Sequence, residues 1–112
     1  MKRVEAIIRK TKFTEMQEAL HEAGIDFMSY WEVRGVGKAV EERSYRGIVY
    51  DTSIIERIMV TFYCQDQFIE PAIKAIMASA KTGEIGDGKI FISDVEKAIK
   101  IRTSEEGVDA LN

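Results

Sequence analysis

The chain has 112 residues, of which 46% are hydrophobic, enough for one compact domain but not for two independent cores. Its 16 basic and 19 acidic residues give a net charge of −3, which argues against binding along a nucleic-acid backbone, because that requires a dominant positive field. The single cysteine excludes an internal disulfide and a cysteine-based zinc site. The sequence has neither the pattern of a signal peptide nor an apolar run of the roughly 18 to 20 residues that a membrane-spanning helix needs. We therefore expect one domain over residues 1–112, located in the cytoplasm.

Strands are predicted where apolar and polar residues alternate, and helices where apolar residues recur at steps of three and four after a capping signal. In chain order, these patterns predict a strand over 4–8, a helix over 14–23, strands over 26–34 and 57–64, a helix whose apolar stripe runs from Ile69 to Ala80, and short strands over 89–93 and 98–102. This β-α-β-β-α-β order with a short extra strand predicts an α+β, ferredoxin-like sandwich, in which two helices cover one face of an antiparallel sheet. In the last two strands, Ile90, Ile92, Ile99 and Ile101 are expected to point inward.

A stretch of about twenty residues without apolar periodicity separates the second and third predicted strands, far more than a hairpin loop needs. Its charged and aromatic side chains suit docking onto a partner protein. The candidate docking residues are Arg43, Tyr45, Arg46 and Tyr50. An insertion without a role remains the alternative. The polar, acidic tail over 103–112 is predicted to be mobile.

Three clusters of glycines and cations suggest a phosphate site. The segment from Thr82 to Lys89 allows successive backbone amides to turn toward an anion, although a plain tight turn explains it equally well on its own. Lys100 and Arg102 are two residues apart in a predicted strand, so their cationic heads would share one face, which a polyphosphate or simply solvent would cover. The third cluster, Gly35-Val36-Gly37-Lys38, ends the second predicted strand.

The residues that catalysis usually needs are scarce. His21, the only histidine, lies beside Glu18 and Glu22 in a predicted helix, where a solvated position is favoured over a general base. Cys64 has no histidine near it in sequence, which favours a structural thiol, and no metal-ligand spacing is present. We expect a regulator that is not an enzyme, with at most slow ATP hydrolysis. The alternatives are a slow nucleotide hydrolase or transferase with Asp87 as base, or a trimeric structural or metal-handling domain.

The segment from Thr82 to Ser93, followed by residues 99–103, closely resembles the second signature of the PII family of nitrogen-regulatory signal proteins. Matches over 6–9 and at Tyr45-Arg46-Gly47 with Tyr50 extend the resemblance over nearly the whole chain. The resemblance implies a homotrimer of ferredoxin-like subunits that binds ATP or ADP, with AMP as a further candidate, in clefts between neighbours. It also implies a protruding T-loop, about residues 37–55, that docks onto an ammonium channel, a nitrogen-metabolism enzyme or another transporter.

The resemblance further implies which residues hold the nucleotide. By position these are Ile7, Met28, Ser29, Gly35, Gly37, Lys38, Thr61, Tyr63, Gly86, Asp87, Gly88, Lys89, Lys100 and Arg102. Lys38 and Lys100 replace arginines of the family, which keeps the charge but loses the bidentate geometry. Thr61 stands where the family has a glutamate. Ala39 stands in place of a glutamine that helps to bind Mg²⁺ and 2-oxoglutarate, and it offers no oxygen to either, which argues against ordinary 2-oxoglutarate sensing.

Overall fold

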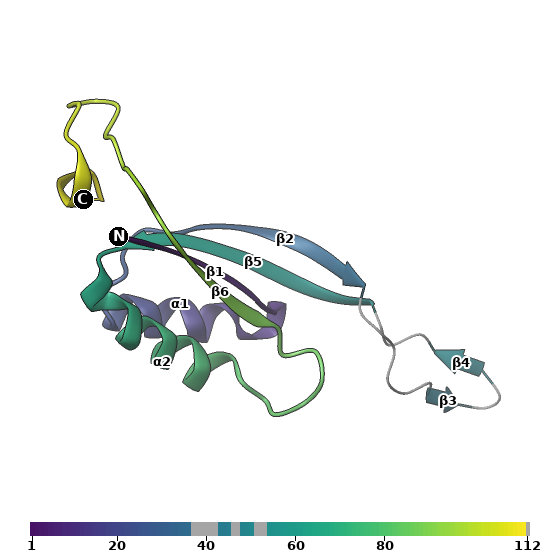
Figure 1. The fold of residues 1–112 in the computed structure, drawn as a ribbon. Helices are drawn as coiled ribbons and strands as arrows, with labels where there is room; N and C mark the ends of the chain where they lie inside the picture. Colours follow the sequence, from purple (N-terminus) through teal and green to yellow (C-terminus); the bar gives the residue numbers. More distant parts are fainter. Residues whose placement is uncertain (37–42, 46–47, 51–53, 112) are drawn as a thin grey trace.

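The computed structural model describes residues 1–36, 43–45, 48–50 and 54–111 of the chain (Figure 1). Its strands and α-helices are β1 (Lys2–Arg9), α1 (Phe13–Glu22), β2 (Ser29–Val36), β3 (Arg43–Tyr45), β4 (Ile48–Tyr50), β5 (Ile54–Cys64), α2 (Ile69–Ala80) and β6 (Lys89–Asp94). Short 3-10 helices cover Lys10–Lys12, Asp66–Phe68 and Gly107–Leu111. Pro71 is the third residue of α2, where its missing N–H removes no helical hydrogen bond.

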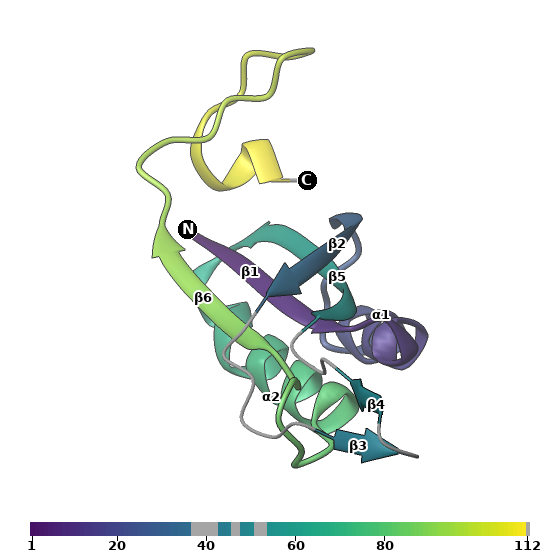
Figure 2. The ribbon, with the colours of Figure 1, turned by 90° about the vertical axis from the view of Figure 1, so that its right-hand side faces the viewer.

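Within the described residues, four strands form an antiparallel sheet in the order β2-β5-β1-β6, and β3 pairs with β4 in a separate two-stranded ribbon. Both α-helices lie on the same face of the larger sheet (Figures 1 and 2). β1 and β2 are parallel to each other, with β5 between them. This order arises because each α-helix returns the chain across one strand before the next strand begins. This is the predicted ferredoxin-like α+β arrangement, which the structure confirms.

The core lies between the helices and the sheet. Every second residue of the two central strands is buried there, as the alternation predicts, and the apolar stripes of both helices close the layer from the other side. The buried residues of these elements are Val4, Ala6, Ile8, Met16, Leu20, Ile58, Val60, Phe62, Cys64, Ala72, Ile76 and Ala80. Burial raises the pKa of the Cys64 thiol, which fits the predicted structural role.

Neither α1 nor α2 covers the opposite face of the sheet, which we call the open face. The residues that alternate with the core positions lie on this face, including Trp31 on β2 and Phe91 on β6. Trp31 is 47% exposed and Phe91 55% exposed, although both are large apolar side chains. Trp31 is therefore not a core residue of the described chain, and large apolar side chains exposed on one face mark a candidate contact surface.

The predicted strand over 98–102 differs from what the structure shows. In the described chain this region holds a single antiparallel bridge between Ile99 and Glu106, followed by a turn at 101–103. Ile90 packs against the core, and Ile92 lies on the same face of the sheet as the buried Val4 although it is 43% exposed on the edge strand, so both point inward as expected. Ile99 and Ile101 are 56% and 98% exposed, so the expectation is wrong for these two. A strand needs a neighbour for its backbone groups along its length, and the described residues pair this segment at a single bridge.

His21 is solvent-exposed, as predicted, and its Nδ1 lies 2.8 Å from Asp26 Oδ1. The predicted strand over 26–34 begins three residues later, at Ser29, because this pair joins the end of α1 to the connecting segment. Among the residues that the structure describes, no helix is long and apolar enough to cross a membrane.

Candidate functional site

The loop that leads from α2 to β6 is organised around the carboxylate of Asp87. Its Oδ2 accepts hydrogen bonds from the backbone N–H groups of Thr82 and Gly83, both at 2.8 Å, and its Oδ1 accepts from the Thr82 hydroxyl. Arg9, at the end of β1, donates from Nε to Asp87 Oδ1 at 3.1 Å and from Nη2 to the carbonyl of Ile85 at 2.8 Å. The loop therefore has a definite shape before any ligand arrives.

These donors determine the charge of Asp87. The Thr82 hydroxyl contributes most, and with the backbone N–H groups and Arg9 it holds the pKa of the Asp87 carboxyl well below its ordinary range, against the opposing effect of desolvation. A carboxylate with so low a pKa is a very weak base, and its oxygens are already occupied by donors. The geometry thus argues against Asp87 as the base of a hydrolase and assigns it to shaping the loop.

Gly88 packs directly against the backbone of β1. A Cβ at this position would lie 1.7 Å from the carbonyl oxygen of Ile7, and the residue has a φ of +100°. Only glycine permits both the close approach and the positive φ. The next residue, Lys89, is exposed and pairs in register with Ile7. The ion pairs found among the described residues do not include Lys89, so its ammonium is available to an anion beside the loop.

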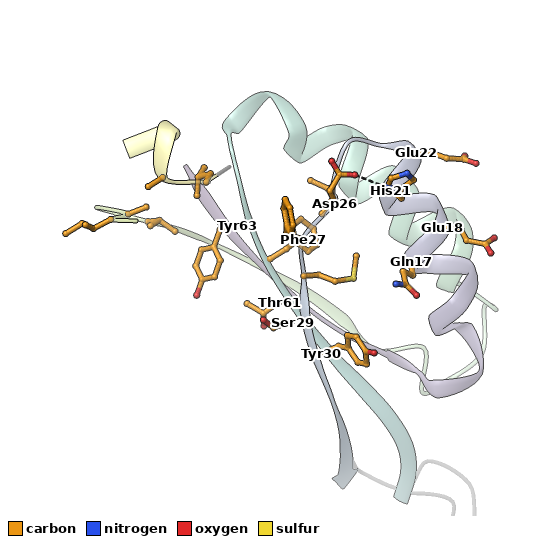
Figure 3. Close-up of a pocket in the computed structure, with 18 of the residues that line it drawn as sticks. Gln17, Glu18, His21, Glu22, Asp26, Phe27, Ser29, Tyr30, Thr61 and Tyr63 are labelled. Atoms are coloured by element: carbon orange, nitrogen blue, oxygen red, sulfur yellow. Dashed lines mark ion pairs between the residues drawn. The ribbon is translucent and has the colours of Figure 1, made fainter. Parts of the chain in front are cut away.

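A second group of candidate residues lines an open groove of about 1020 Å³, which starts at the end of α1 and continues beneath the C-terminal segment (Figure 3). Met28, Ser29, Thr61 and Tyr63 all border this groove. Ser29 on β2 lies opposite Thr61 on β5 in the strand register, which explains why residues distant in sequence meet here. Four of the predicted nucleotide-binding residues therefore border one groove, whereas Ile7, which the resemblance places with them, lies beside Gly88 and Lys89 instead.

Lys100 and Arg102 lie on the C-terminal segment that leaves β6 after Asp94. Their predicted strand is absent, and a turn takes its place, held by hydrogen bonds between Lys100 N–H and the Glu105 carbonyl and between Ser104 N–H and the Lys100 carbonyl, both at 2.8 Å. A common strand face therefore does not align the two cations. Lys100 is partly buried and Arg102 is exposed.

The three predicted clusters do not meet within one chain. Gly35 and the 82–89 loop lie at the end of the sheet where β1 and β2 end and β6 begins, on the two opposite edge strands. The C-terminal segment departs from the other end of β6, where Val95 donates a hydrogen bond to the carbonyl of Met1 (Figures 1 and 2). The six residues of β6 separate the two ends of the sheet by roughly 17 Å at the usual rise per residue.

Several predicted residues cannot be placed. Gly37, Lys38, Ala39 and Arg46 lie outside the described residues. The backbones of Arg43, Tyr45 and Tyr50 belong to the β3–β4 ribbon, whereas their side chains lie outside the description. Their proposed roles in loop closure and docking remain predictions.

Comparison with known proteins decides the family. The family model described as "Nitrogen regulatory protein P-II" matches residues 1–105. The chain belongs to the P-II family. Relatives named nitrogen regulatory protein P-II, from Rhodobacter capsulatus and Cereibacter sphaeroides, are 45% and 43% identical over 112 residues, covering 99% of this chain and 100% of each relative. One from Microchaete diplosiphon is 46% identical over 113 residues.

The sequence analysis did not single out Arg9 and Thr82, two residues that hydrogen-bond to Asp87 and so stabilise the 82–89 loop. Arg9 lies 78 residues from Asp87, and no local pattern connects them. Thr82 had a readable signal, because a threonine five residues before an aspartate in a glycine-rich turn is well placed to hydrogen-bond with it. Phe27, which borders the groove with 76% of its surface exposed, was also not singled out.

The contact between Gly88 and Ile7 predicts a large effect of Gly88→Ala. The added Cβ meets backbone that cannot yield, and the positive φ adds strain, so we expect a loss of about 3 kcal/mol or more in the free energy of unfolding. Gly83→Ala is the matched control, because Gly83 also has a positive φ but open space around it, and it should lose only about 1 kcal/mol. Urea denaturation of both variants measures the difference, and equal losses would contradict the packing argument.

The lowered pKa of Asp87 predicts an acid-dependent stability. Its stabilising contribution is fully present above the unfolded pKa of about 3.9 and is lost as the pH falls below that toward the lower folded value. Wild type should therefore lose stability more steeply than Asp87→Asn between about pH 4 and pH 2 in denaturant titrations. Glu84→Gln, an exposed change in the same loop, should follow wild type. Parallel curves for wild type and Asp87→Asn would refute the assignment.

Proposed function

We propose that this chain is a signal protein of nitrogen regulation that acts in the cytoplasm and binds ATP or ADP, with AMP as a further ligand, between the subunits of a homotrimer. The observation that carries this proposal is the preformed 82–89 loop, in which Asp87 is fully engaged and Lys89 is free of ion pairs within the described chain. Membership of the P-II family supports the regulatory role.

The loop suits the phosphate end of a nucleotide. Gly88 holds the loop backbone against β1, and Gly86 precedes Asp87 with a φ of +101°, a conformation that allows successive amide groups to face an anion. Lys89 adds a positive charge, and Ile7 offers an apolar contact beside it. The groove with Met28, Ser29, Thr61 and Tyr63 suits the base and ribose, because it joins apolar and aromatic walls to a few polar groups.

The separation of these two halves favours a ring of subunits. The 82–89 loop lies at one end of the sheet, whereas the groove and the cations Lys100 and Arg102 lie toward the other end. One chain therefore does not complete the proposed site. A contact between two different surfaces of identical chains is heterologous and closes into a ring when its rotation allows. A trimer would place the loop of one subunit against the groove of its neighbour, and would cover the open face of the sheet.

The signal would pass through the T-loop, about residues 37–55. It follows directly on the paired ends of β2 and β5, where Val36 lies opposite Ile54. A nucleotide changes the shape of such a loop only if it binds the alternative shapes with different affinity. We propose that one shape docks onto a target, such as an ammonium channel, another transporter or a nitrogen-metabolism enzyme, through Arg43, Tyr45, Arg46 and Tyr50.

An enzymatic role is less well supported. Asp87 is a poor base, and the described residues contain no group of three potential metal ligands, which also gives no support to a metal-handling domain. Ala39 supplies no side-chain oxygen, so we propose nucleotide sensing without the usual Mg²⁺ and 2-oxoglutarate contacts.

Calorimetric titration with ATP, ADP and AMP, with and without Mg²⁺ and 2-oxoglutarate, tests the proposal. Lys89→Gln and Arg102→Gln should each weaken ATP binding by about tenfold or more, because each removes a charge-assisted hydrogen bond to a phosphate, and AMP should be affected less. Lys74→Gln, on the exposed side of α2, is the control and should bind as wild type does. Absence of ATP, ADP and AMP binding at millimolar concentration would refute the proposal.

Light scattering after size-exclusion chromatography tests the assembly. Wild type should have the mass of three chains, and Phe91→Glu should dissociate it, because the carboxylate would be buried unpaired on the open face. Ala78→Glu introduces the same charge at an exposed position of α2 and should remain trimeric. A wild-type mass of one chain at tens of micromolar would rule out the ring.

A further inference from the structure

The floor of the groove contains a polar atom that the fold leaves without a partner. Thr61 is buried to 8% exposure and is the buried polar residue of the described chain. Its hydroxyl oxygen is one of two buried side-chain atoms there that make no hydrogen bond, together with Arg57 Nε. An unpaired buried hydroxyl weakens the fold, so its presence calls for an explanation.

The surroundings of Thr61 suggest what that explanation is. Ser29 lies opposite Thr61 in the strand register, and Figure 3 shows the two side chains next to each other at the floor of the groove. Phe27 and Tyr63 border the same groove with flat apolar rings, and Met28 adds a flexible apolar chain. Two adjacent hydroxyls among such walls suit a planar heterocycle that stacks on the rings and presents its polar edge to the floor.

A hydroxyl differs from other polar groups in the hydrogen bonds that it can form with the polar edge of a heterocycle. It donates one hydrogen bond and accepts others, and its hydrogen rotates to suit the partner, whereas a carboxylate only accepts. A site whose polar group can only donate, or only accept, rejects a ligand that presents the same kind of group, because a buried polar group is then left without a hydrogen bond. Thr61 and Ser29 present no fixed polarity, so an amino group and a carbonyl group on the ring are both satisfied.

We infer that Thr61, assisted by Ser29, sets the base specificity of the groove and makes it accept 6-oxo purines as well as the 6-amino purine adenine. This rests on the proposed nucleotide binding and adds to it a selectivity that differs from strict adenine recognition. The chain is thus a sensor of purine nucleotides in general, in which the phosphates and not the base amino group carry the information.

Calorimetry with ATP and inosine triphosphate, which differ at the 6-position, tests this inference on the intact protein. Wild type should bind the two within about threefold of each other. Thr61→Val, of nearly the same shape, should weaken both by about three- to tenfold, as expected for one lost hydrogen bond. Thr61→Glu should create a selection of ATP over inosine triphosphate of at least tenfold, because a carboxylate that faces the 6-position accepts from the amino group of adenine and is repelled by the carbonyl oxygen of hypoxanthine.

Thermal unfolding without nucleotide separates a binding role from a structural one. Thr61→Val should unfold at the same or a higher temperature than wild type, because it removes an unpaired buried hydroxyl, and a lower temperature would indicate a structural role and overturn the inference. Thr11→Val makes the same change at an exposed position outside the groove and should alter neither property.

The possible failures are distinguishable. Wild type that binds neither triphosphate refutes the proposed function itself. Wild type that binds ATP at least tenfold more tightly than inosine triphosphate, or whose ATP affinity is unchanged in Thr61→Val, refutes only the role of Thr61.

Discussion

The contact on which the candidate site depends is the one between the 82–89 loop and the end of β1. Gly88 presses on the carbonyl of Ile7, and Arg9, two residues further along the same strand, holds Asp87 and the Ile85 carbonyl. Residues from opposite ends of the chain thereby fix a loop that short local turns alone would leave free to adopt other shapes. Preorganisation of this kind reduces the ordering entropy that a phosphate ligand would otherwise have to overcome.

The sheet then separates the parts of the site. Because β6 runs antiparallel to β1, the chain enters β6 at the 82–89 loop and leaves it at the other end of the sheet, so Lys100 and Arg102 lie away from that loop. A nucleotide that contacts both parts would have to bridge two subunits, so its binding would also stabilise the assembly by mass action. The length of β6 would therefore link assembly to nucleotide sensing, because it keeps the two parts of the site apart within each chain.

Much of this fold follows from the sequence, and what does not follow has identifiable physical reasons. Val4, Ala6 and Ile8 are buried as their alternation predicts, since a two-residue period leaves one choice of face. The prediction of a strand over 98–102 is wrong because the described residues pair this segment at a single bridge, Ile99 with Glu106, and leave Ile101 exposed; local alternation does not reveal whether a second chain supplies a further partner. The four groove residues were found through family resemblance, but the unpaired hydroxyl of Thr61 depends on packing, which no sequence pattern encodes.

The register of the sheet also suggests how the protein would distinguish nucleotides by their number of phosphates. Ile7 lies opposite Met59, and Gly35 lies opposite Ile55, four residues nearer the start of β5, which is roughly 13 Å along the strands; Lys89 and Gly35 are also three strand spacings, or about 14 Å, apart across the sheet. Both lie at the same end of the strands, so phosphates added beyond Lys89 would bring a nucleotide nearer to the T-loop base without spanning the whole distance within one chain. A longer chain of phosphates would approach the T-loop base while a shorter one would stop before it, so ATP, ADP and AMP would differ in the contacts they offer to the loop. Differential contact of this kind is what a nucleotide needs in order to shift a loop between shapes.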